Sequence, residues 1–269
     1  MKFGICNETF QGWEWKHICE YASDVGYDGV EIAPFTLCDD IRRLSAQDVV
    51  TVRTAAEKAN VEIIGLHWLL VSPKGLSITT ANPDMRANTS DFLSALTRLC
   101  RDLGGKVMVL GSPAQRRLEE ADSSFIAEDR LIEALRPAIE IAEESGITIC
   151  LEPLPAPEAN FLLTLQEAVS LANRIASHAV KTIFDVKSAC SENRPLPDLI
   201  LENRDFIAHV HANDANRRGP GFGDTDFKTV LGPLQAIDYN EYVSVEVFDY
   251  TPDPETIATK SLETLRACL

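Results

Sequence analysis

The segment Ile147–Pro153, ITICLEP, is a short apolar run that ends in an acid and a proline. Its apolar residues occupy both faces of an extended chain, which is typical of a strand buried on both sides in a parallel sheet. Ser145-Gly146 comes just before the run and is typical of a helix end, since glycine readily adopts the left-handed conformation there. The segment is therefore predicted to be a buried strand that follows a helix.

Helical patterns lie on both sides of this strand. Upstream, one apolar stripe has the spacing of a helix face: Leu131, Ala134, Leu135, Ala138, Ile139 and Ala142. Downstream, a second stripe begins after Thr164-Leu165-Gln166-Glu167, which has the pattern of a capping box; Ser45-Ala46-Gln47-Asp48 is a weaker example. The strand is thus predicted to lie between two helices.

The same alternation runs along the whole chain of 269 residues. The eight predicted strands are Phe3–Asn7, Gly29–Pro34, Val61–Trp68, Lys106–Gly111, Ile147–Pro153, Val180–Val186, Ile207–Ala212 and Tyr242–Phe248. Eight β-then-α units without a break in composition predict an α/β protein in which residues 1–269 form a single (β/α)₈ barrel domain. A doubly wound open sheet is the main alternative, but no glycine-rich fingerprint follows the first strand.

The composition restricts the partners and the location of the protein. The formal net charge is −16, which repels nucleic-acid phosphates and anionic lipids, so neither nucleic acid nor membrane is an expected partner. No apolar run approaches the ~18 residues of a membrane span. The seven cysteines are scattered and form no CxxC pair, which favours a reducing compartment and a cytoplasmic protein. The oligomeric state stays open, with a homo-oligomer among the possibilities.

Side chains capable of chemistry stand at the ends of four successive predicted strands. In a barrel the active site lies at the carboxyl ends of the strands. The fifth to eighth strands end in Glu152, Asp185, His211 and Glu246. Carboxylates in apolar surroundings are costly unless they are paired or bind a cation. Because neighbouring strand ends converge in a barrel, this pattern favours a metal site over a set of unrelated ion pairs.

The ligand types indicate which metal the site would hold. Three carboxylates and one imidazole make a hard, mostly oxygen site, which suits one divalent ion. Mn²⁺ is the favoured cofactor, while Mg²⁺, Co²⁺ and Zn²⁺ are also compatible. No cysteine is among these ligands, which disfavours a structural zinc site.

Further polar residues on the strands have alternative interpretations. His67 ends the third strand and is interpreted as a substrate contact in preference to a packing residue. His209 points the same way as His211 because the two lie two residues apart in one strand. It is either a partner of the site or a core histidine. Glu31 lies on the second strand.

The order Glu, Asp, His, Glu on the last four strands resembles that of the xylose isomerase-like barrel superfamily. It is similar in particular to sugar isomerases and epimerases of the tagatose 3-epimerase and hydroxypyruvate isomerase type. Leu151-Glu152-Pro153-Leu154 resembles their fifth-strand motif, and His209-Val210-His211-Ala212-Asn213-Asp214 resembles their seventh-strand motif. This resemblance implies a metal-dependent isomerase or epimerase that moves a proton on a sugar or sugar phosphate through an enediolate.

The resemblance also implies roles for single residues. Glu152 and Glu246 correspond to the acid/base pair and, with Asp185 and His211, to the metal ligands. Glu158 and Arg217 correspond to substrate contacts. One position departs from the family pattern, which has a histidine three residues after the metal-binding aspartate where this chain has Ser188. A serine cannot serve as the proton shuttle that a histidine provides, so the pattern of a ketose 3-epimerase is incomplete.

Two other functions are compatible with the same residues. One is a lyase that acts on 3-keto glycosides, using the same metal and base but expelling a leaving group. The other is a catalytically silent barrel that binds a sugar, although a complete set of costly carboxylates disfavours it. The apurinic endonucleases of the superfamily hold three zinc ions with many more histidines, whereas this chain has five histidines in all. The stretch Arg217–Asp224 is rich in glycine and proline and is predicted to be a loop that could close over the site.

Overall fold

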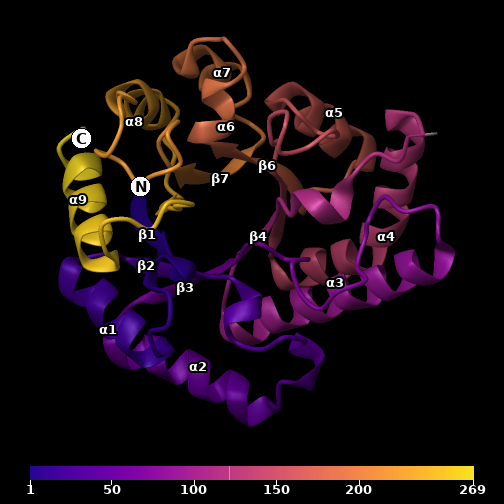
Figure 1. The fold of residues 1–269 in the computed structure, drawn as a ribbon, viewed down its shortest axis with the longest axis horizontal. Helices are drawn as coiled ribbons and strands as arrows, with labels where there is room; N and C mark the ends of the chain where they lie inside the picture. The colour runs from indigo at the N-terminus through magenta and orange to yellow at the C-terminus, as the bar shows by residue number, and fades with distance from the viewer. Residues whose placement is uncertain (121) are drawn as a thin grey trace.

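The computed structural model describes residues 1–120 and 122–269, and in it the parallel strands close into a barrel (Figure 1). The strands are β1 (Lys2–Cys6), β2 (Gly29–Ile32), β3 (Glu62–Leu66), β4 (Val107–Leu110), β5 (Thr148–Leu151), β6 (Val180–Asp185), β7 (Ile207–Ala212) and β8 (Tyr242–Val245). Each strand pairs with the next, and β8 returns to pair with β1 through Ile5 and Val245. The predicted (β/α)₈ barrel is confirmed.

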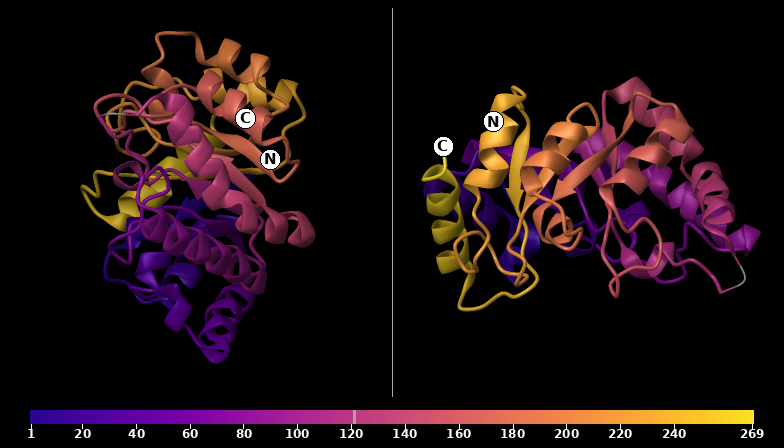
Figure 2. Two further views of the ribbon diagram at one scale, coloured as in Figure 1. Left: turned by 90° about the vertical axis from the view of Figure 1, so that its right-hand side faces the viewer. Right: turned by 90° about the horizontal axis from the view of Figure 1, so that it is seen from above.

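Helices surround the barrel on its outside (Figures 1 and 2). They are α1 (Trp15–Val25), α2 (Ala46–Ala59), α3 (Pro83–Leu103), α4 (Ser124–Ser145), α5 (Leu165–Ile175), α6 (Val186–Cys190), α7 (Leu196–Glu202), α8 (Lys228–Ala236) and α9 (Pro254–Arg266). Short 3₁₀ helices follow some strands: η1 (Asn7–Phe10), η2 (Pro34–Thr36), η3 (Ile41–Arg43) and η4 (Pro113–Arg116). None of the helices in the described ranges has the length and apolarity needed to cross a bilayer.

Each predicted strand overlaps an observed strand; β1 begins one residue earlier than predicted, and several strands were predicted too long at their carboxyl ends. β2 ends at Ile32 and β5 ends at Leu151, in both cases two residues before a proline, which cannot donate to the hydrogen-bond ladder. β8 ends at Val245, and the backbone N–H of Phe248 donates instead to a carbonyl in the loop after β7. The backbone N–H groups of Glu152 and Glu246, which follow β5 and β8, still donate to Leu110 and Ala212 of neighbouring strands, so both residues are held at the strand ends.

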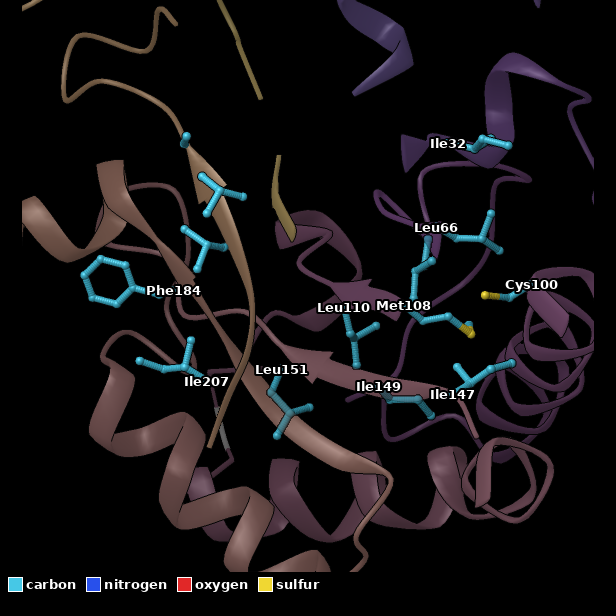
Figure 3. Packing of buried hydrophobic residues seen from close by; sticks show 14 of the residues in the cluster. Ile32, Leu66, Cys100, Met108, Leu110, Ile147, Ile149, Leu151, Phe184 and Ile207 are labelled. Carbon is cyan, nitrogen blue, oxygen red and sulfur yellow. The ribbon is translucent and has the colours of Figure 1, made fainter. Parts of the chain in front are cut away.

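Side chains of the strands alternate between the helices and the barrel interior. One set packs in a single core with residues of the helices, as Figure 3 shows around Cys100 of α3. Its members on β4 and β5 are Met108, Leu110, Ile149 and Leu151. The intervening residues form a separate buried cluster: Val107, Val109, Cys150 and Ile183. Because strand side chains alternate with a period of two, Glu152 and Asp185 point the same way as Cys150 and Ile183, toward the barrel axis.

The helix ends and apolar stripes predicted from the sequence are confirmed, and one helix cap has a different hydrogen-bond partner. All six residues of the predicted stripe in α4 are buried, and Gly146 ends that helix in the left-handed conformation at φ +63°. Ser45 and Asp48 form a complete capping box at α2. At α5 the Thr164 side chain accepts from the backbone of Glu167, but the longer Glu167 side chain reaches one residue further back, to the N–H of Leu163.

Candidate metal centre

The four predicted metal ligands lie together at the carboxyl end of the barrel. Glu152 follows β5, Asp185 ends β6, His211 lies near the end of β7, and Glu246 follows β8. One potential ligand atom from each of them lies within 4.8 Å of the others, and all four side chains are buried. The strand ends thus bring together the four residues that the sequence singled out.

The donor set of this cluster fits a divalent cation. Nδ1 of His211 is buried without a hydrogen-bond partner in the described residues, 3.2 Å from Glu246 Oε2 and 3.8 Å from Glu152 Oε1. Burial raises the pKa of Glu152, and the carboxylates of Glu246 and Asp185 raise it further. A cation between these groups would relieve the repulsion among the carboxylates and would accept the free lone pair of Nδ1.

Neighbouring donors hold the carboxylates in place. Asn213 Nδ2 donates to Asp185 Oδ2 at 2.6 Å and to Glu246 Oε2 at 3.2 Å. Asp185 is also the N-cap of α6, so its Oδ1 accepts from the backbone N–H of Ser188 at 2.7 Å. Trp68 Nε1 donates to Glu246 Oε1 at 3.2 Å. These contacts fix the direction of the two carboxylates before any ion binds.

A fully buried carboxylate, Glu31 of β2, lies behind His211. Its oxygens lie 2.8 Å from Nε2 of His209 and 3.3 Å from Nε2 of His211. Burial opposes the charge, but His209 and His211 outweigh it and hold the pKa of Glu31 well below its usual range. A carboxylate only accepts, so the nitrogen of His211 that faces Glu31 carries the proton and Nδ1 is directed at Glu152 and Glu246. His209 is therefore a partner of the site through Glu31.

We expect Glu31→Gln to weaken metal binding by roughly 10- to 100-fold, the range found when an outer partner of a metal-bound histidine is removed. The neutral amide has one acceptor oxygen in place of two and presents an NH₂ donor where the second oxygen was, so the orientation of His211 becomes less well defined. Competition against a chelator, followed by the EPR signal of free Mn²⁺, measures the affinity.

The matched control is Glu62→Gln, which makes the same change at an exposed residue that begins β3, at the opposite end of the barrel. This variant should bind Mn²⁺ like the wild type. Normal affinity in a folded Glu31→Gln protein would show that His211 is oriented without Glu31.

A small cavity opens beside the four ligands and encloses ≈ 30 Å³. Its lining residues are His67, Trp68, Gly111, Pro113, Glu152, Leu154, Glu158, Glu246 and Phe248. A Cβ atom on Gly111 would lie 1.5 Å from Glu152 Oε2, so only glycine leaves room for this carboxylate. Glu152 and Glu246 face the same cavity from two strands that are not neighbours in the barrel.

The three predicted substrate contacts have different positions. His67 and Glu158 line the cavity, and Glu158 accepts from Lys187 Nζ at 2.8 Å and 3.1 Å. Burial opposes the charge of Lys187, but Asp185 and Glu158 raise its pKa. Arg217 is exposed and does not line the cavity; its guanidinium lies 5.4 Å from the ring centre of Phe248, at the cavity edge.

This barrel and its site have counterparts among known proteins. Residues 19–268 match the model of the family described as xylose isomerase-like TIM barrel. The chain belongs to this family. The resemblance that the strand-end motifs indicated is thereby confirmed.

Individual relatives within the xylose isomerase-like family are epimerases by name. A 3-dehydro-D-guloside 4-epimerase of Escherichia coli (strain K12) is 26% identical over 100% of both chains. A D-psicose 3-epimerase of Ruminiclostridium cellulolyticum is 24% identical over 92% of this chain and 84% of the relative. The crystal structure of a D-psicose 3-epimerase with D-tagatose, from Clostridium cellulolyticum H10, has a TM-score of 0.87 at 21% identity and covers 100% of this chain and 99% of that one. This last likeness shows that the fold is shared.

Glu8 is a site candidate of this xylose isomerase-like barrel that strand-end reasoning did not identify. It lies in η1, directly after β1, and is 7% exposed. Its Oε2 lies 2.7 Å from Nε2 of His67, and burial of His67 is outweighed by Cys6 and Glu8, which raise the pKa of the imidazole well above its usual range. The signal was present in the sequence, because Glu8 follows the first strand as Glu246 follows the last.

Proposed function

We propose that the protein is a divalent-metal-dependent sugar epimerase that works by proton transfer next to a carbonyl group. The observation that carries this proposal is that Glu152 and Glu246 belong to the candidate metal cluster and also line its cavity. Membership of the xylose isomerase-like family and the epimerase names of the relatives support it. Isomerisation is the other outcome that the same groups can produce.

The chemistry follows from the two carboxylates. A divalent cation bound by the four ligands, Mn²⁺ by preference, would act as a Lewis acid and stabilise the charge that develops on the sugar oxygen. One glutamate removes the proton from the carbon beside the carbonyl. The other returns a proton to the opposite face and inverts that carbon, whereas return to the neighbouring carbon gives an isomer. The Trp68 N–H bond to Glu246 Oε1 orients one of these two groups.

The remaining polar groups of the cavity are proposed to hold the sugar hydroxyls. His67 would exchange a hydrogen bond with a sugar hydroxyl on one side of the cavity. Glu158 would accept a hydrogen bond from a hydroxyl on the other side, with the positive charge of Lys187 Nζ beside its carboxylate. Lys187 thus places a cation near the position where the family pattern has a histidine. Arg217 is proposed to reach the substrate by a movement of its loop, since its guanidinium lies at the cavity edge on Phe248.

Hydrogen exchange into sugars tests this proposal. The Mn²⁺-loaded protein is incubated in D₂O with a panel of ketoses and keto glycosides, the reaction is stopped with excess chelator, and products are examined by NMR. We expect deuterium at the carbon beside the carbonyl together with a product of inverted configuration, because a removed proton exchanges with solvent. Loss of a leaving group in place of inversion would identify a lyase. A metal-loaded protein that exchanges no sugar in the panel would contradict the proposal and favour a binding function.

A further inference from the structure

A groove lies next to the metal centre on the same face of the barrel and encloses ≈ 390 Å³. Its walls come from η1, the start of α1, η2 and the segment after β8, which all follow the carboxyl ends of neighbouring strands (Figure 1). Trp13, Phe35 and Tyr250 contribute aromatic rings to it. Phe35 is 37% exposed, so part of its ring is accessible from the groove.

Glu8 connects this groove with the catalytic cavity. It lines the groove, and its Oε2 contacts His67, which lines the cavity. One potential ligand atom from each of Glu8, His67 and Glu246 lies within 4.8 Å of the others. The cavity beside the metal ligands encloses only ≈ 30 Å³, so a ligand that extends beyond the reacting carbons has the groove as its adjoining space.

The lining of the groove selects a neutral ligand that carries hydroxyl groups. Glu8 is the one charged residue in the described lining, which contains neither lysine nor arginine, and a carboxylate repels phosphates and acids. Oε1 of Glu8 is buried and has no hydrogen-bond partner in the described residues, so it offers an acceptor to a hydroxyl donor. Aromatic faces such as those of Trp13 and Phe35 suit the apolar C–H face of a sugar ring.

We propose that the groove is a subsite for a second sugar ring, so that the preferred substrate is a neutral two-ring glycoside and neither a one-ring sugar nor a sugar phosphate. This inference rests on the proposed epimerase function. The reacting carbons of the first sugar lie at the cavity beside Glu152 and Glu246, the glycosidic bond passes Glu8, and the second ring lies between Trp13, Phe35 and Tyr250.

Matched sugars with one and two rings test the subsite. Deuterium exchange is measured for D-fructose against maltulose, and for methyl 3-keto-β-D-glucopyranoside against 3-keto-cellobiose. We expect kcat/KM to be at least about tenfold higher for the two-ring member of the accepted pair, mainly through a lower KM, because contacts away from the reacting carbons bind ground state and transition state alike. Equal kcat/KM values within each pair would overturn the proposal.

Two variants test whether the groove residues cause the higher kcat/KM of two-ring sugars. Phe35→Ala and Trp13→Ala should each reduce the ratio of two-ring to one-ring kcat/KM toward one. Phe125→Ala is the matched control, since Phe125 is a 62% exposed aromatic residue on α4, and it should leave the ratio unchanged. An unchanged ratio in both groove variants would also overturn the proposal.

Tryptophan fluorescence separates a failure of the subsite from a failure of the proposed function. The chain has three tryptophans, and Trp68→Phe leaves Trp13 and Trp15, which both line the groove, as the reporters. Cellobiose should change the emission of this variant saturably, whereas D-glucose 6-phosphate at the same concentrations should not. If no sugar exchanges deuterium, the epimerase function is refuted, and this titration still shows whether the groove binds a two-ring sugar. No response to cellobiose would contradict the subsite itself.

Discussion

Glu152→Gln and Glu246→Gln should each lower turnover by roughly 10²- to 10⁴-fold, the loss typical of a missing general acid or base, while retaining bound metal. Glutamine keeps the size of the side chain and one coordinating oxygen, but it cannot accept the proton. Alanine would remove metal binding and proton transfer together and would not separate them. Product formation is followed by NMR and metal content by elemental analysis of the same samples.

The control for these two variants is Glu241→Gln, the same change at an exposed residue directly before β8, which should keep normal turnover. The two catalytic variants can also differ from each other. If one glutamate removes the proton and the other returns it, one variant will still exchange deuterium into the substrate without forming product. Near-normal turnover in both, with metal bound, would place the base elsewhere, with His67 or Lys187 as the next candidates.

The purified protein should contain close to one divalent ion per chain, and Asp185→Ala should weaken its binding by more than the roughly 100-fold expected at most for an outer partner such as Glu31. Asp185 contributes a charged oxygen to the cluster and also caps α6. Loss of the cap alone costs about 0.5–2 kcal/mol of folding stability. Asp185→Asn separates the two effects, because the amide oxygen still accepts from Ser188 but the negative charge is gone.

Elemental analysis and chelator competition measure the metal, and circular dichroism establishes that each variant is folded. Asp205→Ala, at an exposed aspartate shortly before β7, is the control and should retain the ion. A well-folded wild-type protein that binds none of Mn²⁺, Mg²⁺, Co²⁺ and Zn²⁺ would refute the metal site. Equal metal affinities of Asp185→Asn and wild type would remove Asp185 from the ligand set.

Local pattern was sufficient to predict the strands and to single out four residues that meet. The bounds of β7 were predicted as observed, and the polar pair Asn213-Asp214 follows Ile207–Ala212 directly. Glu152, Asp185, His211 and Glu246 could be chosen because each stands at the end of its own strand, and closure of the barrel brings all such ends to one face.

The remaining contacts depend on the closed barrel and have no local signal. Glu31 of β2 meets His209 of β7, although these strands are not neighbours, because both side chains point to the barrel axis. The pairing of Glu8 with His67 likewise joins segments after β1 and β3. The groove combines three segments that follow β1, β2 and β8, so its existence depends on the final position of each.

Pairing of β8 with β1 has a consequence for biosynthesis of the chain. β5, β6 and β7 supply three of the four candidate ligands and leave the ribosome before β8, which is followed by Glu246. A nascent chain therefore carries an incomplete site until β8 docks between β7 and β1. A cation that requires all four residues binds the closed barrel in preference to open forms, and by mass action it stabilises the completed chain. Metal supply would then influence the last step of folding as well as catalysis.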